Sequence, residues 1–213
     1  MSVPSITPPP TCAPFIVLEG VDGSGKTTQA QQLADWLRAQ GRQVLLTREP
    51  GGTALAERLR GIVLDAAIPC APRAELLLML AARAQHVAEV IAPALAAGTV
   101  VISDRFSLSS LAYQGYGRGL PLEDIRQADA VARAGTVPTL TIVLALPLAV
   151  TLSRIGERQD RFEGEGRAFL QRVIDGYQQL AATDDGVCAV NGAETPEQVQ
   201  AALRALVAPV LAP

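Results

Sequence analysis

Short apolar runs alternate along the chain with longer stretches in which apolar residues recur at helical spacing. The apolar runs predict five strands, over residues 15–19, 43–47, 99–103, 139–145 and 187–190. The stretches between them predict helices near residues 26–40, 54–65, 73–92, 106–114, 122–134, 147–155, 166–182 and 195–207. Strands that are apolar on both faces and separated by helices are typical of a parallel sheet covered on both sides. The pattern therefore predicts one α/β domain over residues 14–213.

The first 13 residues, MSVPSITPPPTCA, are rich in proline and lack charge and periodicity, so we interpret them as a disordered or extended leader. Of the 213 residues, 49% are apolar and 18% are charged, which excludes a chain that is disordered throughout. No uninterrupted apolar run reaches the roughly 18 residues of a membrane span. Because the net charge is −3, neither nucleic acid nor a membrane is expected as a partner.

The few cysteines and the single histidine limit the kinds of disulfide, metal site and catalytic site that the chain can form. Cys12, Cys70 and Cys188 are odd in number and far apart, without the spacing of a disulfide framework or a metal site, so we expect a reducing cytoplasm. The single histidine, His86, argues against a His-based triad and a multi-His metal site. His86 is interpreted as a structural or interface residue.

The sequence GVDGSGKTT directly follows the first predicted strand and opens a predicted helix. It matches the phosphate-binding pattern G-x-x-x-x-G-K-[ST], in which backbone N–H groups and the helix N-terminus surround phosphate oxygens. Lys26 is the only lysine among 18 basic residues, and we expect it to contact the β- and γ-phosphates while the Thr27 hydroxyl binds Mg²⁺. The predicted ATP-binding residues here are Gly20, Val21, Asp22, Gly23, Ser24, Gly25, Lys26, Thr27 and Thr28.

A GTPase is excluded, because its guanine-binding N-K-x-D segment requires a second lysine. A small-molecule kinase and a switch-like ATPase remain.

Asp104 and Arg105 follow the third predicted strand, where an aspartate could bind a Mg²⁺-ligated water and an arginine could hold phosphates. The alternative is that the pair caps the following helix. Arg48 and Pro50, in the segment TREPGG after the second strand, are expected to face the same cleft, although these residues alone could form a plain turn.

The segments EGVDGSGKTT, TREPGGT, LAARAQ, SDRFSLSSLAYQG and DRFE occur in the order and spacing of bacterial thymidylate (dTMP) kinases. The chain resembles this family from about residue 15 to about residue 208. The resemblance implies the P-loop nucleoside monophosphate kinase fold, with a five-stranded parallel sheet of order 2-3-1-4-5 covered by helices on both faces. It also implies the reaction ATP + dTMP → ADP + dTDP for dTTP biosynthesis, with Mg²⁺ as cofactor, in a cytoplasmic homodimer.

The same resemblance implies roles for individual residues. The Asp22 carboxylate would bind the 3′-hydroxyl of dTMP, Arg83 would contact thymine O4, and the Tyr113 ring would crowd the ribose 2′ position. The full set implied for dTMP is Asp22, Arg48, Pro50, Met79, Arg83, Arg105, Ser110, Tyr113 and Gln114. Thr27 and Asp104 are implied for the metal, and Lys26, Arg105, Arg158 and Arg161 for catalysis.

Residues 155–166, IGERQDRFEGEG, interrupt the helical pattern with glycines and alternating charges. Their composition is typical of a solvated loop, and the resemblance implies a lid over ATP. The P-loop contains no arginine, so the chain resembles members whose basic residues lie in the lid, here Arg158 and Arg161. Arg154 corresponds to an arginine near adenine.

Two residues depart from the family pattern: Met79 replaces a phenylalanine that stacks on thymine, and Ala145 replaces a frequent aspartate. The alternatives are a kinase for another nucleotide or deoxynucleoside and, in a different class, a non-catalytic P-loop module that binds nucleotides.

Overall fold

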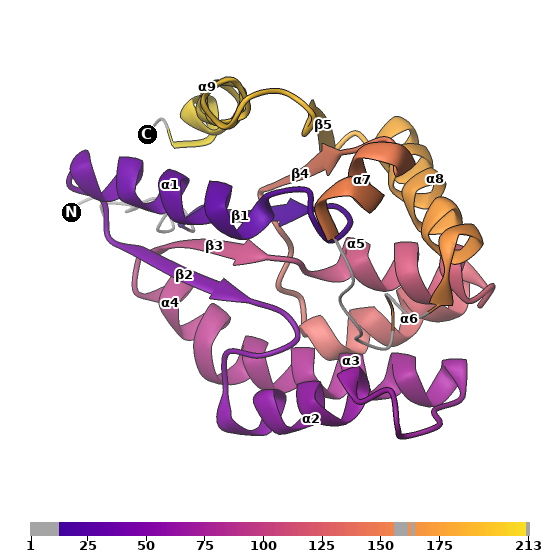
Figure 1. The fold of residues 1–213 in the computed structure, drawn as a ribbon. Helices are drawn as coiled ribbons and strands as arrows, with labels where there is room; N and C mark the ends of the chain where they lie inside the picture. Colours follow the sequence, from indigo (N-terminus) through magenta and orange to yellow (C-terminus); the bar gives the residue numbers. More distant parts are fainter. Residues whose placement is uncertain (1–12, 156–161, 163–164, 212–213) are drawn as a thin grey trace, which may run out of the picture.

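The computed structural model describes residues 13–155, 162 and 165–211. Its centre is a parallel sheet of five strands in the order β2-β3-β1-β4-β5 (Figure 1), as the family resemblance implied. The strands are β1 (Phe15–Glu19), β2 (Val44–Arg48), β3 (Val100–Asp104), β4 (Leu140–Ala145) and β5 (Val187–Asn191). Each lies within one residue of its predicted bounds. Continuous apolar runs fix these strands well, because both faces of the sheet are buried.

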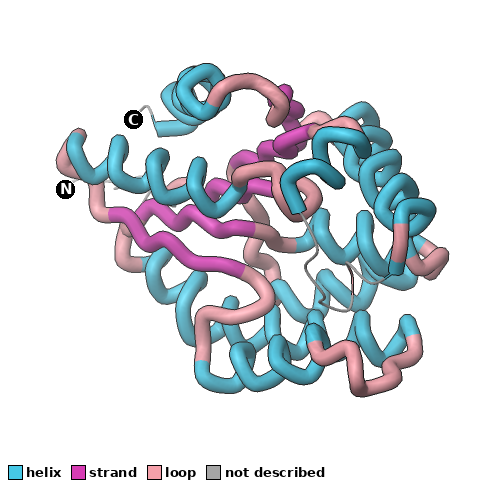
Figure 2. Tube along the Cα trace, in the orientation of Figure 1, coloured by secondary structure: helices cyan, strands magenta, loops and turns pink. Residues whose placement is uncertain are grey.

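Helices cover both faces of the sheet (Figure 2). The helices are α1 (Lys26–Ala39), α2 (Ala54–Leu64), α3 (Pro72–His86), α4 (Ala92–Ala96), α5 (Ser107–Ser110), α6 (Leu122–Arg133), α7 (Leu148–Ile155), α8 (Arg167–Thr183) and α9 (Pro196–Val207). Two π-helical segments, η1 (Val87–Ile91) and η2 (Leu111–Gly117), and a 3₁₀ segment, η4 (Ala208–Leu211), extend them.

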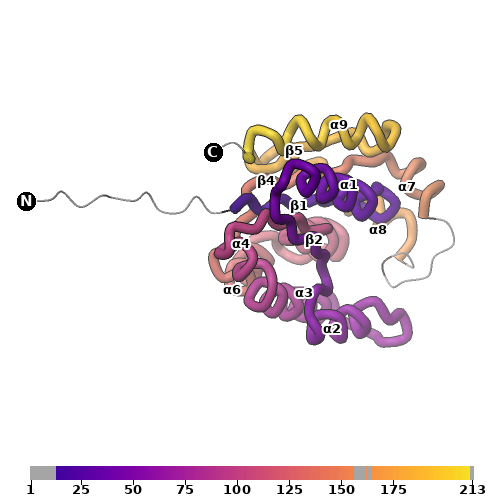
Figure 3. The backbone as a smooth tube through the Cα atoms, turned by 90° about the vertical axis from the view of Figure 1, so that its left-hand side faces the viewer, coloured from indigo at the N-terminus to yellow at the C-terminus, as the bar shows by residue number. Residues whose placement is uncertain are grey.

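Alternate residues of β1 face opposite cores. Ile16 and Leu18 pack with apolar residues of α1 and α9, whereas Phe15 and Val17 pack with η1 on the other face of the sheet. Figure 3 shows α1 and α9 above the sheet and α3 and α6 below it. The side-chain alternation of a strand thus ties both helical layers to the central β1.

The third helix is longer than predicted, because α3, η1 and α4 run without a break from Pro72 to Ala96. Pro93 lacks an N–H group and would stop an ordinary helix. The preceding π-helical turn shifts the hydrogen-bond register, which allows the helix to continue. By length and composition alone this helix could cross a membrane, although charged residues interrupt its apolar sequence. It nevertheless buries Glu75 and Arg83 within the protein.

The register of the sheet brings the carboxyl ends of three strands together. Leu18 of β1 lies opposite Asp104 of β3, and Asp104 in turn lies opposite Arg48 of β2. The segments that follow β1 and β3 therefore begin at the same edge of the sheet. Ligand sites of open parallel sheets form at this edge.

Candidate active site

The loop after β1 has the geometry of a phosphate-binding loop. Gly20 has a φ of +137°, and an added Cβ would lie 2.7 Å from the Leu144 carbonyl oxygen, so only glycine fits there. Gly25, in the left-handed region, precedes Lys26, the first residue of α1. The strand, loop and helix predicted for this motif are all present, with the N-terminus of α1 directed at the loop's interior.

Lys26 is buried inside this loop. Its Nζ donates to the Val21 carbonyl oxygen (2.9 Å) and to Ser24 Oγ (3.3 Å). Burial lowers the pKa of Lys26 to about 8, and the positive charge of Arg105 acts in the same direction. The ammonium group is thus held among backbone atoms with too little negative charge nearby, an environment that an anionic phosphate would improve.

We expect ATP binding at pH 8.5 to take up a proton at Lys26. With a pKa of about 8, most of the free protein carries the neutral amine at this pH, and bound phosphates favour the charged form. ATP therefore raises the pKa, and its affinity should fall as the pH rises above about 8. Calorimetry in buffers of different ionisation enthalpy measures the uptake. Lys26→Arg, which is permanently charged, is the control; equal uptake by both proteins would contradict this account.

Thr27 and Asp104 meet beside the P-loop. The Thr27 hydroxyl donates to Asp104 Oδ2 at 2.6 Å, although the two residues are 77 positions apart in the sequence. Hydroxyl and carboxylate oxygens are ligands that Mg²⁺ prefers. Within the described part of the chain no group of three or more His, Cys, Asp or Glu residues gathers as a metal site, so a cation here would depend on ligands from the nucleotide and water as well.

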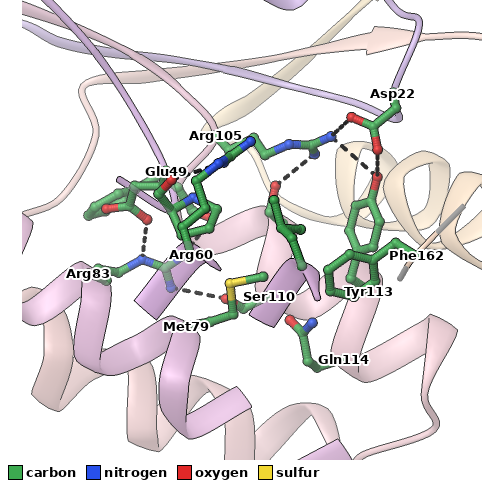
Figure 4. A pocket seen from close by; sticks show the side chains of 14 residues that line it. Asp22, Glu49, Arg60, Met79, Arg83, Arg105, Ser110, Tyr113, Gln114 and Phe162 are labelled. Carbon is green, nitrogen blue, oxygen red and sulfur yellow. Dashed lines mark hydrogen bonds and ion pairs between the residues drawn. The ribbon is translucent and has the colours of Figure 1, made fainter. Parts of the chain in front are cut away.

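A cavity opens next to the P-loop, with about 620 Å³ of empty space when its open mouth is included. It is lined by Asp22, Glu49, Pro50, Arg60, Leu64, Met79, Arg83, Arg105, Phe106, Ser109, Ser110, Tyr113, Gln114 and Phe162. Of the nine residues implied for dTMP, all but Arg48 are in this lining. Figure 4 shows Asp22 and Arg105 at one end and Met79, Ser110 and Gln114 toward the other.

Arg105 links the cavity to the P-loop. Its guanidinium donates to the Gly20 carbonyl oxygen (2.8 Å), to Asp22 Oδ1 (2.7 Å) and to the Tyr113 hydroxyl (3.3 Å). Although burial acts to raise the pKa of Asp22, the charges of Arg105 and Lys26 outweigh it and lower this pKa to about 2. Arg105 also has a φ of +77°, and such strain in a non-glycine residue is typical of functional sites.

Ser109, Tyr177 and Glu19 form a hydrogen-bonded network with Arg105. Arg105 Nη1 donates to Ser109 Oγ (3.2 Å) and the Tyr177 hydroxyl (3.1 Å). Both hydroxyls also donate to Glu19 Oε2, at 2.6 and 3.0 Å. Burial raises the pKa of Glu19 despite the nearby charge of Arg105. Glu19 and Tyr177 were not predicted from the sequence. The available signal was Glu19 itself, an acidic residue at the end of an otherwise apolar strand.

Arg83 is the centre of a buried polar network at the cavity wall. Nε donates to Glu49 Oε2 (2.7 Å), and Nη1 donates to Asp129 Oδ1 (2.6 Å) and Ser110 Oγ (3.1 Å). Nη2 donates to the Phe106 carbonyl oxygen (2.9 Å). Four of its five N–H groups are thus hydrogen-bonded within the protein, so the guanidinium is fixed in the wall as a group that can only donate.

His86 supports this network from the protein interior. Its Nδ1 lies 3.1 Å from Glu49 Oε1 and its Nε2 lies 2.7 Å from Thr47 Oγ1. A Cβ at Gly52 would lie 2.6 Å from the imidazole ring, so the loop after β2 packs directly on it. His86 is fully buried, which confirms the prediction of a structural residue.

The prediction that Arg48 faces the cleft is wrong. The Arg48 side chain is 55% exposed and donates through Nη2 to both carboxylate oxygens of Glu57, at 3.0 and 3.1 Å. Glu57 also accepts from the Gly52 N–H, which ties Arg48 to the outer side of the loop. Arg60, which follows Glu57 by one turn of α2, lines the cavity instead. It donates to the Pro50 carbonyl oxygen at 3.0 Å.

The remaining predicted nucleotide residues lie around the P-loop or outside the described part. Arg154, at the end of α7, is exposed and donates through Nη1 to the carbonyl oxygens of Gly23 (3.3 Å) and Gly192 (3.0 Å). It therefore lies against the outer side of the P-loop. Arg158 and Arg161 lie outside the residues that the structure describes, so their roles stay predictions.

Met79 lines the cavity, and Met79→Phe is expected to lower the KM for dTMP several-fold with little change in kcat. A stacked aromatic ring contributes about 1–3 kcal/mol in nucleic-acid binders, whereas a methionine sulfur contributes about 0.3–1.5 kcal/mol. Steady-state kinetics measures the effect. Thermal melting is the control, because an overpacked ring costs about 1–3 kcal/mol of stability. A variant as stable as the wild type with unchanged KM would show that Met79 does not face the base.

Three comparisons with known proteins agree with this geometry. The family model described as thymidylate kinase matches residues 18–203. A thymidylate kinase of Synechococcus sp. (strain WH7803) is 51% identical over 199 residues, which cover 89% of this chain and 92% of that protein. One from Desulfovibrio desulfuricans (strain ATCC 27774 / DSM 6949 / MB) is 46% identical over 196 residues, covering 87% and 90%.

A solved structure resembles the chain over nearly its whole length. The crystal structure of thymidylate kinase from Ehrlichia chaffeensis superposes with a TM-score of 0.75 and 31% identity. The match covers 92% of this chain and 98% of that one. Together with the P-loop, the adjoining cavity and the strand order, these matches establish that the chain belongs to the thymidylate kinase family.

Proposed function

We propose that dTMP occupies the cavity with its phosphate toward Arg105 and its thymine toward Gln114, while the P-loop holds the phosphates of ATP. As a member of the thymidylate kinase family, the protein catalyses ATP-dependent phosphorylation of dTMP. The observation that carries the proposed arrangement is Arg105, which lines the cavity and donates to the P-loop carbonyl of Gly20. One guanidinium thus reaches both sites.

Phosphoryl transfer depends on positioning and charge neutralisation rather than on a protein nucleophile. The dTMP phosphate oxygen attacks the γ-phosphorus in line, and ADP leaves. In the described part of the chain, Lys26 and Arg105 lie next to the proposed reacting groups. We propose that these two cations stabilise the negative charge that develops in the transition state. The lid arginines, Arg158 and Arg161, are proposed to complete this set when ATP is bound.

Thr27 and Asp104 would hold Mg²⁺ or the water bound to it. Their oxygens are already 2.6 Å apart, because α1 begins and β3 ends at the ligand-binding edge of the sheet. The chemistry that Mg²⁺ supplies when bound is neutralisation of the β- and γ-phosphate oxygens.

Arg60, rather than Arg48, is proposed to bind the phosphate of dTMP. We expect Arg60→Ala to raise the KM for dTMP about tenfold or more, since charge-assisted hydrogen bonds are strong in a partly desolvated site. Arg48→Ala removes the same charge from the neighbouring exposed pair and should change KM less than about twofold. Steady-state kinetics of both variants tests this assignment, and the opposite order of effects would overturn it.

A second copy of the chain is proposed to cover the outer side of α2 and α3. Leu55 and Ile62 of α2 are 48% and 42% exposed, and Leu77 of α3 is 62% exposed. Exposed apolar side chains on adjoining helices are typical of a subunit interface. Light scattering should therefore give twice the mass of one chain.

A cytoplasmic location without nucleic-acid or membrane partners remains our proposal from the charge and cysteine pattern.

An assay of ADP release with ATP–Mg²⁺ tests the acceptor. The panel is dTMP, dUMP, dCMP, dGMP, UMP and thymidine. We expect dTMP to give the highest kcat/KM. Preference for thymidine would indicate a nucleoside kinase, preference for another monophosphate a different nucleotide kinase, and no turnover with any acceptor a nucleotide-binding module.

A further inference from the structure

Gln114 lies at the end of the cavity away from Asp22 and Arg105 (Figure 4). Its Nε2 donates to Glu75 Oε1 at 2.9 Å, and both side chains are buried, at 1% and 0% exposure. A carboxylate can only accept, so the NH₂ group of Gln114 must be the side that faces Glu75. The carbonyl oxygen of Gln114 is therefore the side left for a ligand.

Glu75 is itself held in place by Arg118. The Arg118 guanidinium donates from Nε to Glu75 Oε1 (3.2 Å) and from Nη2 to Glu75 Oε2 (2.9 Å). Arg118 also pairs with Glu165 and lies over the Phe169 ring, with its carbon 4.9 Å from the ring centroid. Glu75 belongs to α3, whose neighbouring Leu76 is in the core. The carboxylate therefore cannot turn away from Gln114.

The cavity thus offers hydrogen-bonding groups of opposite kinds to a base. Gln114 presents an acceptor, whereas Arg83 can only donate. Thymine carries an N3–H donor next to the O4 acceptor. Cytosine carries an N3 acceptor next to an amino donor, so both positions would meet a group of the same kind. A buried polar group that is left without a hydrogen-bond partner strongly lowers the affinity for the ligand.

We propose that Glu75 is a specificity-determining positioning residue, which by fixing the Gln114 amide makes the cavity select a base with an imide N–H over an aminopyrimidine. This inference rests on the proposed placement of dTMP. Glu75 is not part of the cavity lining and acts only through Gln114. Nothing in the segment AELLLML marks it except an acidic residue within an apolar helix.

The test is the ratio of kcat/KM for dTMP to kcat/KM for 5-methyl-dCMP, which differ only at N3 and position 4. In Glu75→Gln, two amides face each other and can pair in either orientation, so Gln114 is free to turn its NH₂ group to the ligand. We expect kcat/KM for dTMP to fall about three- to tenfold and the ratio to fall about tenfold or more. The control is Glu123→Gln, which removes the same negative charge from an exposed position on α6 and should leave the ratio unchanged.

A merely structural role for Glu75 would lower both activities equally, and an unchanged ratio in a folded Glu75→Gln variant would overturn the proposal. Thermal melting reports whether the variant folds. Should it not fold, Glu75→Asp keeps a negative charge for Arg118 but is too short to reach Gln114, and the same fall in the ratio is expected. Failure of the proposed function is distinct, because the wild type itself would then not phosphorylate dTMP.

Discussion

Replacing Lys26 with methionine is expected to lower kcat by about 10²–10³, because one preorganised charge contact to the transition state is lost. Because Lys26 is also expected to contact the phosphates of bound ATP, kcat/KM for ATP should fall at least as far as kcat. Single-turnover and steady-state kinetics measure both. Activity within about tenfold of the wild type would contradict the assignment of Lys26.

Stability is the control for this variant. Folding lowers the pKa of Lys26 from 10.5 to about 8, so protonation of Lys26 opposes folding increasingly as the pH falls from 10.5, and the cost is at its full size below about pH 8. Methionine removes this buried charge while it keeps the length of the side chain. The melting temperature at pH 7 should therefore be equal to or higher than that of the wild type. A large loss of stability would indicate a structural role instead.

Arg105→Ala should also lower kcat by about 10²–10³, since this guanidinium reaches both substrate sites. It should destabilise the protein as well, because the carboxylates of Glu19 and Asp22 lose the positive charge beside them. Kinetics and thermal melting measure the two effects separately. A variant that keeps kcat near the wild-type value would remove Arg105 from phosphoryl transfer.

Arg105→Gly is the matched control for the backbone. It removes the same side chain, but glycine accepts the φ of +77° without the cost of roughly 1–2 kcal/mol that a Cβ adds in the left-handed region. The glycine variant should therefore be as inactive as the alanine variant yet melt at a higher temperature. Equal melting temperatures would show that the backbone at Arg105 is not strained.

The sequence predicted the strands and the P-loop well because their signals are local. The five apolar runs set β1 to β5 within one residue, and the order of glycines around Lys26 specifies one loop conformation. The length of the helix from Pro72 was underestimated, since a π-helical turn before Pro93 depends on packing that no propensity describes. Of the nine residues that the resemblance implies for dTMP, eight line the cavity.

Residues that act through distant partners were harder to find. Glu19 meets Tyr177 across 158 positions of the sequence, and Glu75 meets Gln114 across 39. Arg48 was misplaced for the opposite reason: it pairs with a carboxylate only nine positions away, that of Glu57, on the outer side of the loop. Acidic residues inside apolar segments were the one usable signal, because a buried carboxylate requires partners.

The most direct measurement of the central claim is ³¹P NMR of the protein incubated with ATP, Mg²⁺ and dTMP. Transfer between the P-loop and the cavity predicts that the signals of dTDP and ADP grow together in equal amounts, with no rise in inorganic phosphate. ADP that forms with free phosphate while the dTMP signal stays constant would contradict the claim, because ATP would then be hydrolysed without reaching an acceptor in the cavity.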